Sequence, residues 1–195
     1  METVLENLIP KIIGCSVSYR VNVFQGKRDL IRKLPDRLRG YKKWPPNDWK
    51  IVVLIDKDSD DCLKLKHNLE KMAKSAGFPT KTKPSPNGFF NVINRIAVEE
   101  LEAWFFGDWK AVCEAYPRVP KNLRRKRGFA DPDSISGGTW EKLEKILQDA
   151  GYFKGGLSKT IAAGEISRFM LPERNDSRSF QVFCNGLLET IKNGN

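Results

Sequence analysis

The stretch IVVLIDKDSDD, residues 51–61, decides the fold class of this chain. Its first five residues are all apolar, a pattern typical of a strand that is buried on both faces of a parallel sheet. Four aspartates follow within the next six residues. The stretch therefore predicts a buried strand with a group of carboxylates at its carboxyl end.

Strand and helix patterns alternate on both sides of this stretch. We predict strands over 17–24, 51–55 and 89–98, followed in turn by helices that begin near 27, extend over 60–76 and lie around 101–105. Such alternation is typical of a parallel sheet with crossover helices. The chain begins instead with a helical pattern over 2–13, which has no strand before it.

After residue 107 the patterns are helical only. They predict helices over 108–116, 139–150, 157–170 and 179–192, the second with Thr139 as its N-cap and Gly151 just past its end. The length of 195 residues suits one domain. We expect an α/β core over 1–107 and a helical extension over 108–195, within a single domain over 1–195.

The chain carries 34 Lys or Arg and 24 Asp or Glu, a formal net charge of +10. This balance favours a polyanionic partner, such as nucleic acid or another phosphate-bearing ligand. No apolar run approaches the roughly 18 residues of a membrane span, and no signal-peptide pattern opens the chain, so we expect no membrane partner. The 4 cysteines lie far apart without a Cys-x-x-Cys pair, which predicts reduced thiols in a cytoplasmic protein.

Polar side chains follow each predicted strand. Residues 25–29 follow the first strand, 56–61 the second and 99–102 the third. Open parallel sheets bind their ligands at the edge where the carboxyl ends of the strands meet. We therefore expect these three groups of residues to share one site.

Asp56 and Asp58 are the candidate metal ligands of the second group. Two carboxylates one residue apart at a strand end reach a single hard cation, and oxygen ligands suit Mg²⁺ or Mn²⁺. Asp56 also ends a buried strand, where an unpaired charge is costly. For Asp60 and Asp61 we favour the simpler role of capping the next helix and complementing its dipole.

Glu99 and Glu102, in the third group, are one helical turn apart, and either would complete the metal shell. The alternative is the ordinary electrostatics of a helix start. The single histidine, His67, lies in a predicted helix, which argues against a His-based triad, a His-rich zinc site or a cysteine nucleophile with its base.

Gln25, Gly26, Lys27 and Arg28, in the first group, precede and open a predicted helix. The N–H groups of a helix start and the two cations are suited to bind phosphate, although lysines at a helix start are often only solvated. The basic stretches over 27–43 and 118–127 suit a nucleic-acid surface, with a solvated face as the alternative.

Several segments of the chain resemble a bacterial family, the domain-of-unknown-function family 4276 (DUF4276). They are FQGKRDL (24–30), VLIDKD (53–58), RIAVEELEAW (95–104), YFK (152–154) and SF (179–180). The family is regarded as TOPRIM-like, similar to the catalytic domain of topoisomerases, primases and the overcoming-lysogenisation-defect nucleases. The resemblance implies a TOPRIM-like α/β fold and an ATPase partner in a defence-type system.

A TOPRIM site pairs an Asp-x-Asp with a glutamate that follows the first strand. Asp56 and Asp58 match the Asp-x-Asp. The glutamate would stand in a Glu-Glu-Pro-Ser-like segment just before the helix over 2–13, and the sequence starts inside that segment. We therefore expect the first strand and its acid to be missing, in agreement with the helix that has no strand before it.

These observations and the resemblance together imply a nuclease-like activity. We expect Mg²⁺-dependent cleavage of nucleic-acid phosphodiester bonds, with DNA favoured over RNA as the substrate and with Asp56, Asp58 and Glu102 as catalytic residues. The alternative is a non-catalytic module that binds nucleic acid or an ATPase partner.

Overall fold

The structure, a computed structural model, describes residues 1–43, 49–58, 60–98, 100–153, 155–156 and 158–193. The chain forms two compact units. The helical unit comprises Met1–Val21 and Val98–Cys184, and the sheet unit comprises Asn22–Ala97 and Asn185–Asn195. Within the described residues the fold is mixed α/β, with many helices and one parallel sheet of two strands. The single domain over 1–195 stays a prediction.

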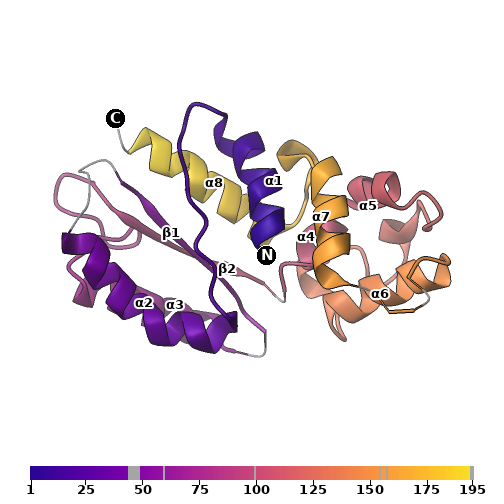
Figure 1. Ribbon diagram of the computed structural model, residues 1–195, viewed down its shortest axis with the longest axis horizontal. Coiled ribbons are helices and arrows are strands. Elements are labelled where there is room, and N and C mark those ends of the chain that lie inside the picture. Colours follow the sequence, from indigo (N-terminus) through magenta and orange to yellow (C-terminus); the bar gives the residue numbers. More distant parts are fainter. Residues whose placement is uncertain (44–48, 59, 99, 154, 157, 194–195) are drawn as a thin grey trace. The chain divides into compact units, whose positions relative to one another are not determined.

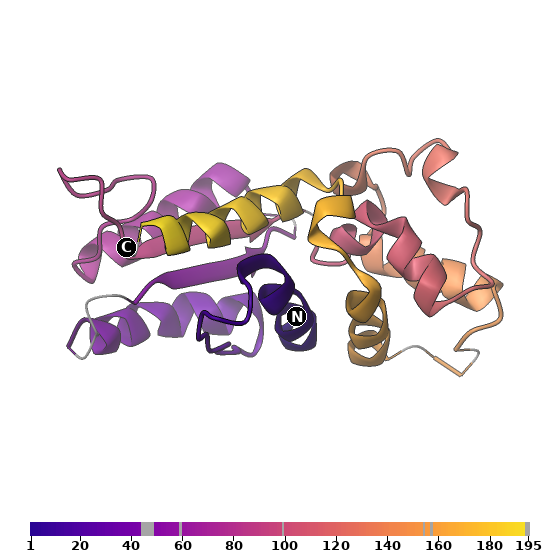
Figure 2. The ribbon, with the colours of Figure 1, turned by 90° about the horizontal axis from the view of Figure 1, so that it is seen from above.

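The sheet unit is built on strands β1 (Ile51–Asp56) and β2 (Val92–Ala97). They pair in parallel, with Ile51 opposite Val92 and Asp56 opposite Ala97, and they run side by side in Figure 2. Helix α3 (Cys62–Ser75) lies between them in the chain. The predicted strand over 51–55 and the crossover helix after it are therefore confirmed, and the predicted strand over 89–98 is confirmed over its central part.

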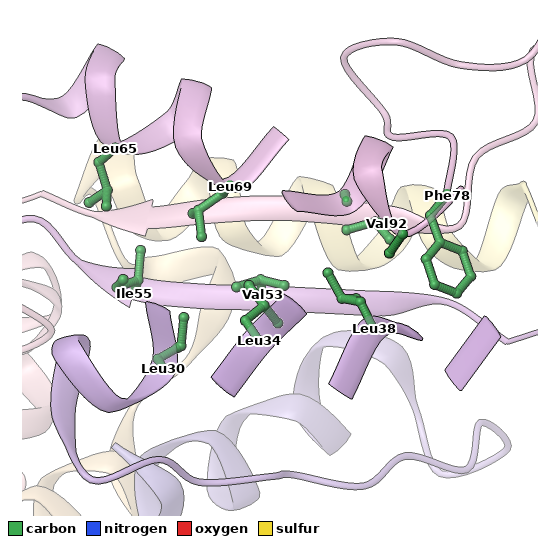
Figure 3. Close-up of a cluster of buried hydrophobic side chains, with 11 residues drawn as sticks. Leu30, Leu34, Leu38, Val53, Ile55, Leu65, Leu69, Phe78 and Val92 are labelled. Atoms are coloured by element: carbon green, nitrogen blue, oxygen red, sulfur yellow. The ribbon is translucent and has the colours of Figure 1, made fainter. Parts of the chain in front are cut away.

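Helix α2 (Gly26–Lys43) packs against α3, and both lie on one side of the sheet (Figure 1). Apolar side chains of the two helices and the two strands meet in one cluster, shown in Figure 3. Its buried members are Leu30, Leu34, Leu38, Val53, Ile55, Leu65, Leu69, Ala73, Ala76, Phe78 and Val92. Because burial of this apolar surface orients α2 along the sheet, the first turn of α2 lies beside the residues that follow β1.

The predicted strand over 17–24 is wrong. These residues lie in neither a helix nor a strand, and Tyr19 and Val23 are exposed. Apolar and polar residues alternate here as a half-buried strand requires, but a strand also needs a neighbour for its N–H and C=O groups. In the described part of the chain, only β1 and β2 supply such a ladder, and they pair with one another.

Six helices form the core of the helical unit: α1 (Glu2–Ile13), α4 (Ala103–Gly107), α5 (Trp109–Ala115), α6 (Thr139–Asp149), α7 (Lys159–Phe169) and the first part of α8 (Arg178–Lys192). The predicted helices of this region are thus confirmed to within a few residues. Trp104 is fully buried and stacks on Phe183, with 5.2 Å between ring centroids. None of the helices in the described ranges combines the length and apolar character needed to cross a bilayer.

Thr139 is the first residue of α6, not its N-cap as predicted. The hydroxyl of Thr139 and the backbone N–H of Trp140 both donate to the carboxylate of Glu100, at 2.9 and 3.1 Å. A residue far away in sequence therefore accepts the hydrogen bonds of the helix start, and local sequence patterns do not reveal such a partner. Gly151 follows the end of α6 with φ +80°, as predicted.

Candidate functional site

The first turn of α2 follows a sharp bend of the backbone at Gly26. Gly26 has φ +81°, in the left-handed region that glycine adopts without strain. The carboxylate of Asp29 reaches back to the backbone N–H of Gln25 at 3.1 Å and also accepts from Arg32 and Lys33. Hydrogen bonds from Lys33 and Arg32 hold the pKa of Asp29 well below its usual range. Asp29 therefore stays ionised and holds the bend in place.

Lys27 lies between two carboxylates that follow β1. Its Nζ is 2.6 Å from Oδ2 of Asp58 and 2.8 Å from Oδ2 of Asp60, and it donates to the carbonyl of Lys57 at 2.8 Å. The Lys27 side chain is only 18% exposed, whereas both aspartates are about half exposed. Burial alone would lower the pKa of Lys27, but the hydrogen bonds to Asp58 and Asp60 outweigh it and raise the pKa.

A hollow of about 620 Å³ opens at this position. Its walls come from the start of α2 and from the segment after β1, and the residues that line it are Gln25, Gly26, Lys27, Arg28, Ile31, Asp58 and Asp60. The structure thus brings the four residues predicted to bind phosphate together with Asp58. The N–H groups of the first helical turn have no acceptor within the helix, so they add to the positive potential of this hollow.

Asp56 is not among the residues that line this hollow. Asp56 ends β1, half-buried, and pairs in register with Ala97. Glu102 belongs to the helical unit, at the start of α4, and burial raises the pKa of its carboxyl group. Glu99 lies outside the described residues.

The two aspartates for which capping was favoured have different roles. Asp61 is the N-cap of α3, where its carboxylate accepts from the backbone N–H of Lys64 at 2.8 Å, as predicted. Asp60 instead pairs with Lys27, which corrects the expectation that it serves the helix start. The crossover fold places the segment after β1 beside the start of α2, but the sequence gives no signal for this particular pairing.

The described ranges of the chain contain no group of three or more His, Cys, Asp or Glu side chains that could hold a metal ion together. In this structure the ammonium group of Lys27 pairs with both Asp58 and Asp60, and its one positive charge offsets only part of theirs. Binding of Mg²⁺ or Mn²⁺ stays a prediction.

The model of a family described as a domain of unknown function (DUF4276) matches residues 1–188 of the chain. No curated protein and no solved structure matches it. The resemblance noted from the sequence is thereby confirmed over nearly the whole chain.

Proposed function

The chain belongs to the DUF4276 family, and we propose that it binds nucleic-acid phosphate groups at the start of α2 and cleaves phosphodiester bonds there with Mg²⁺ or Mn²⁺. One observation carries the proposal: Lys27 and Arg28 share a single hollow with the carboxylates of Asp58 and Asp60. Cations at a helix start suit a phosphate, and carboxylates beside them suit the metal that would act on it. The Asp-x-Asp after a parallel strand also supports the TOPRIM-like fold that we propose for the sheet unit.

The donors of this hollow fit a divalent cation. Asp58 and Asp60 each direct one oxygen at the same ammonium group, so their carboxylates already converge on one positive charge. Mg²⁺ binds through one or two protein carboxylates, with water and phosphate oxygens in its other positions. We propose Asp58 as a ligand, with Asp60 and Asp56 as its partners. When bound, the metal would supply an activated water and stabilise charge on the phosphate.

Lys27 and Arg28 have separate roles in this proposal. Lys27 is held by Asp58 and Asp60 in this structure, and with a metal bound to these carboxylates its ammonium group would be available to a phosphate oxygen. Arg28 is exposed, and its planar guanidinium group suits two oxygens of one phosphate. Contacts to phosphate oxygens carry no information about the bases, so we expect binding at this hollow to be independent of nucleotide sequence.

The test uses the full chain with supercoiled plasmid and with a labelled single strand of DNA, in MgCl₂, in MnCl₂ and in EDTA. We expect nicking in either metal and none in EDTA. Asp58→Asn should abolish both nicking and the rise in melting temperature on adding Mn²⁺, because a ligand bound only by the folded state stabilises it. Asp36→Asn, an exposed position on α2, is the matched control and should change neither.

Binding is tested separately from cleavage. Arg28→Met should weaken binding of the single strand and lower the slope of log K against log salt by about 0.7, the effect of one lost phosphate contact. Lys71→Met, an exposed cation of α3, should leave the slope unchanged. Undiminished nicking by the Asp56→Ala, Asp58→Ala double variant would overturn the metal assignment. Steeply salt-dependent binding without nicking in either metal would instead establish the non-catalytic alternative.

A further inference from the structure

A second hollow, of about 490 Å³, lies within the helical unit. It forms where the end of α5, the segment after α6 and the last turns of α7 meet. The residues that line it are Ala115, Tyr116, Tyr152, Phe153, Glu165, Arg168 and Phe169. Four of the seven are aromatic, and a carboxylate and a guanidinium group stand among them, which is the composition of a ligand site rather than of a packed core.

The aromatic rings are set at steep angles to one another. The ring of Tyr116 meets that of Tyr152 at 63° and that of Phe153 at 75°, with 5.0 and 5.6 Å between centroids. Tyr116 is 3% exposed and forms the floor, whereas Phe169, 44% exposed, stands at the rim. The ring of Phe169 is therefore the one that a flat ligand entering from solvent can stack against.

Phe153 is held in a strained conformation. Its φ of +53° lies in the left-handed region, which a bulky side chain rarely adopts. In this conformation the ring rests against Tyr116 and lines the hollow. Backbone strain of this kind persists only where the surroundings enforce it, and it is common at ligand sites.

The carboxylate of Glu165 is directed by Tyr116. The Tyr116 hydroxyl donates to Oε2 of Glu165. Burial, and then the hydrogen bond to Glu165, raise the pKa of Tyr116, so the hydroxyl keeps its proton over the physiological range. Among the described residues, Oε1 of Glu165 has no hydrogen-bond donor, and a carboxylate accepts more than one donor at each oxygen. Glu165 can therefore receive two adjacent N–H groups of a ligand.

Two arginines lie in or beside this hollow. Arg168 lines the hollow, and the guanidinium group of Arg118 lies over the ring of Tyr152, 4.1 Å from its centroid. Arg118 begins the basic stretch over 118–127, in which Lys121 and residues 125–127 are exposed. A cationic ligand would be repelled here, whereas a phosphate attached to the ligand would be attracted.

We propose that this hollow binds a guanine base that carries a phosphate. This inference rests on the nucleic-acid binding proposed above and adds to it a preference for guanine. The base stacks on the ring of Phe169, its adjacent N1–H and N2–H groups donate to Glu165, and its phosphate meets Arg118 or Arg168. The base edges of adenine, cytosine and uracil do not present two adjacent N–H donors of this kind. The geometry therefore distinguishes guanine from the other bases.

The test is calorimetric titration of the full chain with GMP, IMP, AMP and CMP. We expect GMP to bind about tenfold more tightly than AMP or CMP, the discrimination of one good bidentate pair. IMP keeps N1–H and lacks the amino group, so it should lie between them. A short strand of thymidines with one central guanine, compared with the same strand of thymidines alone, decides whether the ligand is a free nucleotide or a base within a strand.

Different variants test the contribution of the Glu165 carboxylate and that of the aromatic rings. Glu165→Gln should remove the preference for GMP, because an amide presents only one acceptor, whereas Glu144→Gln on α6 should not. Phe169→Ala should weaken all four nucleotides alike, whereas Ile161→Ala, which truncates another exposed apolar side chain of α7, should weaken none. Tyr116→Phe keeps the floor of the hollow and should reduce the preference only in part.

Two results would overturn the inference. One is no saturable binding of any nucleotide and no difference between the two strands. The other is a preference for GMP that survives in Glu165→Gln. The inference and the proposed function fail independently, because one is tested by base preference in variants of the helical unit and the other by metal-dependent nicking in variants of the sheet unit.

Discussion

Gly107, the last residue of α4, lies against the side chain of Asn175 with no space for a Cβ atom. A Cβ at position 107 would also stand 2.8 Å from the backbone nitrogen of Ser177. Asn175 is held there by two hydrogen bonds, from its Nδ2 to the carbonyl of Trp104 at 2.8 Å and from the Ser177 N–H to its Oδ1 at 3.0 Å. The backbones before α8 and after α4 are thus in direct contact.

We predict that Gly107→Ala destabilises the protein by about 1–3 kcal/mol, because the added methyl group forces a buried backbone segment to move. Urea unfolding of the purified chain measures the change. Gly40→Ala is the control: nothing lies within 4 Å of the added Cβ, and position 40 is inside α2. That variant should be neutral or gain up to about 1 kcal/mol from helix propensity. Equal losses in both variants would contradict the contact at Gly107.

Glu70 of α3 gives a prediction about pH. Burial opposes its ionisation, but hydrogen bonds from Thr80, Asn94 and Lys66 outweigh that effect and lower the pKa of Glu70. A carboxyl group with a lowered pKa in the folded state stabilises the protein above its unfolded pKa of about 4.5, and the stabilisation is lost as pH falls through the folded value.

We therefore expect Glu70→Gln to lower the free energy of unfolding by about 1.5–3 kcal/mol at pH 7, the cost of a lost charged hydrogen bond. The difference between variant and wild type should shrink steadily below pH 4.5. Urea unfolding at several pH values measures it, with Glu141→Gln on α6 as an exposed control. A difference that is independent of pH would show that the charge of Glu70 is not what stabilises the network.

The buried carboxylate of Asp108 gives the third prediction. It is fully buried and caps α5 through Ala111, and Arg174 Nε donates to it at 2.6 Å. Arg174→Met should cost about 3–5 kcal/mol, because it leaves a buried charge without its partner. Arg39→Met removes the partner of the exposed Asp36 on α2 and should cost less than about 1 kcal/mol. Thermal unfolding ranks the two variants, and the reverse order would refute the burial argument.

Local patterns were sufficient for most elements of this chain. The uninterrupted apolar run at 51–55 is a strand, and leucines at helical spacing, such as Leu30 and Leu34 of α2, face the core. These patterns succeed because each depends on which side of a single element is buried. The pattern over 17–24 fails because a strand depends on a neighbour, and alternation in one segment carries no information about the other.

The candidate site, too, was predictable from the sequence only in part. The aspartates after β1 and the cations at the start of α2 are visible in the sequence, and the crossover topology predicts that they meet. The particular pairing of Lys27 with Asp58 and Asp60 was not visible, because it depends on the path of a loop and on side-chain reach.

The sequence by itself determined the helices, the strand over 51–55, the family and the residues gathered at the start of α2, because each follows from local spacing or from a resemblance. Only the tertiary structure decided that Asp60 serves Lys27, that Glu100 satisfies the start of α6 and that Tyr116 directs Glu165. These contacts join segments distant in the chain. Their free energy depends on distance and burial, which exist only once the chain is packed.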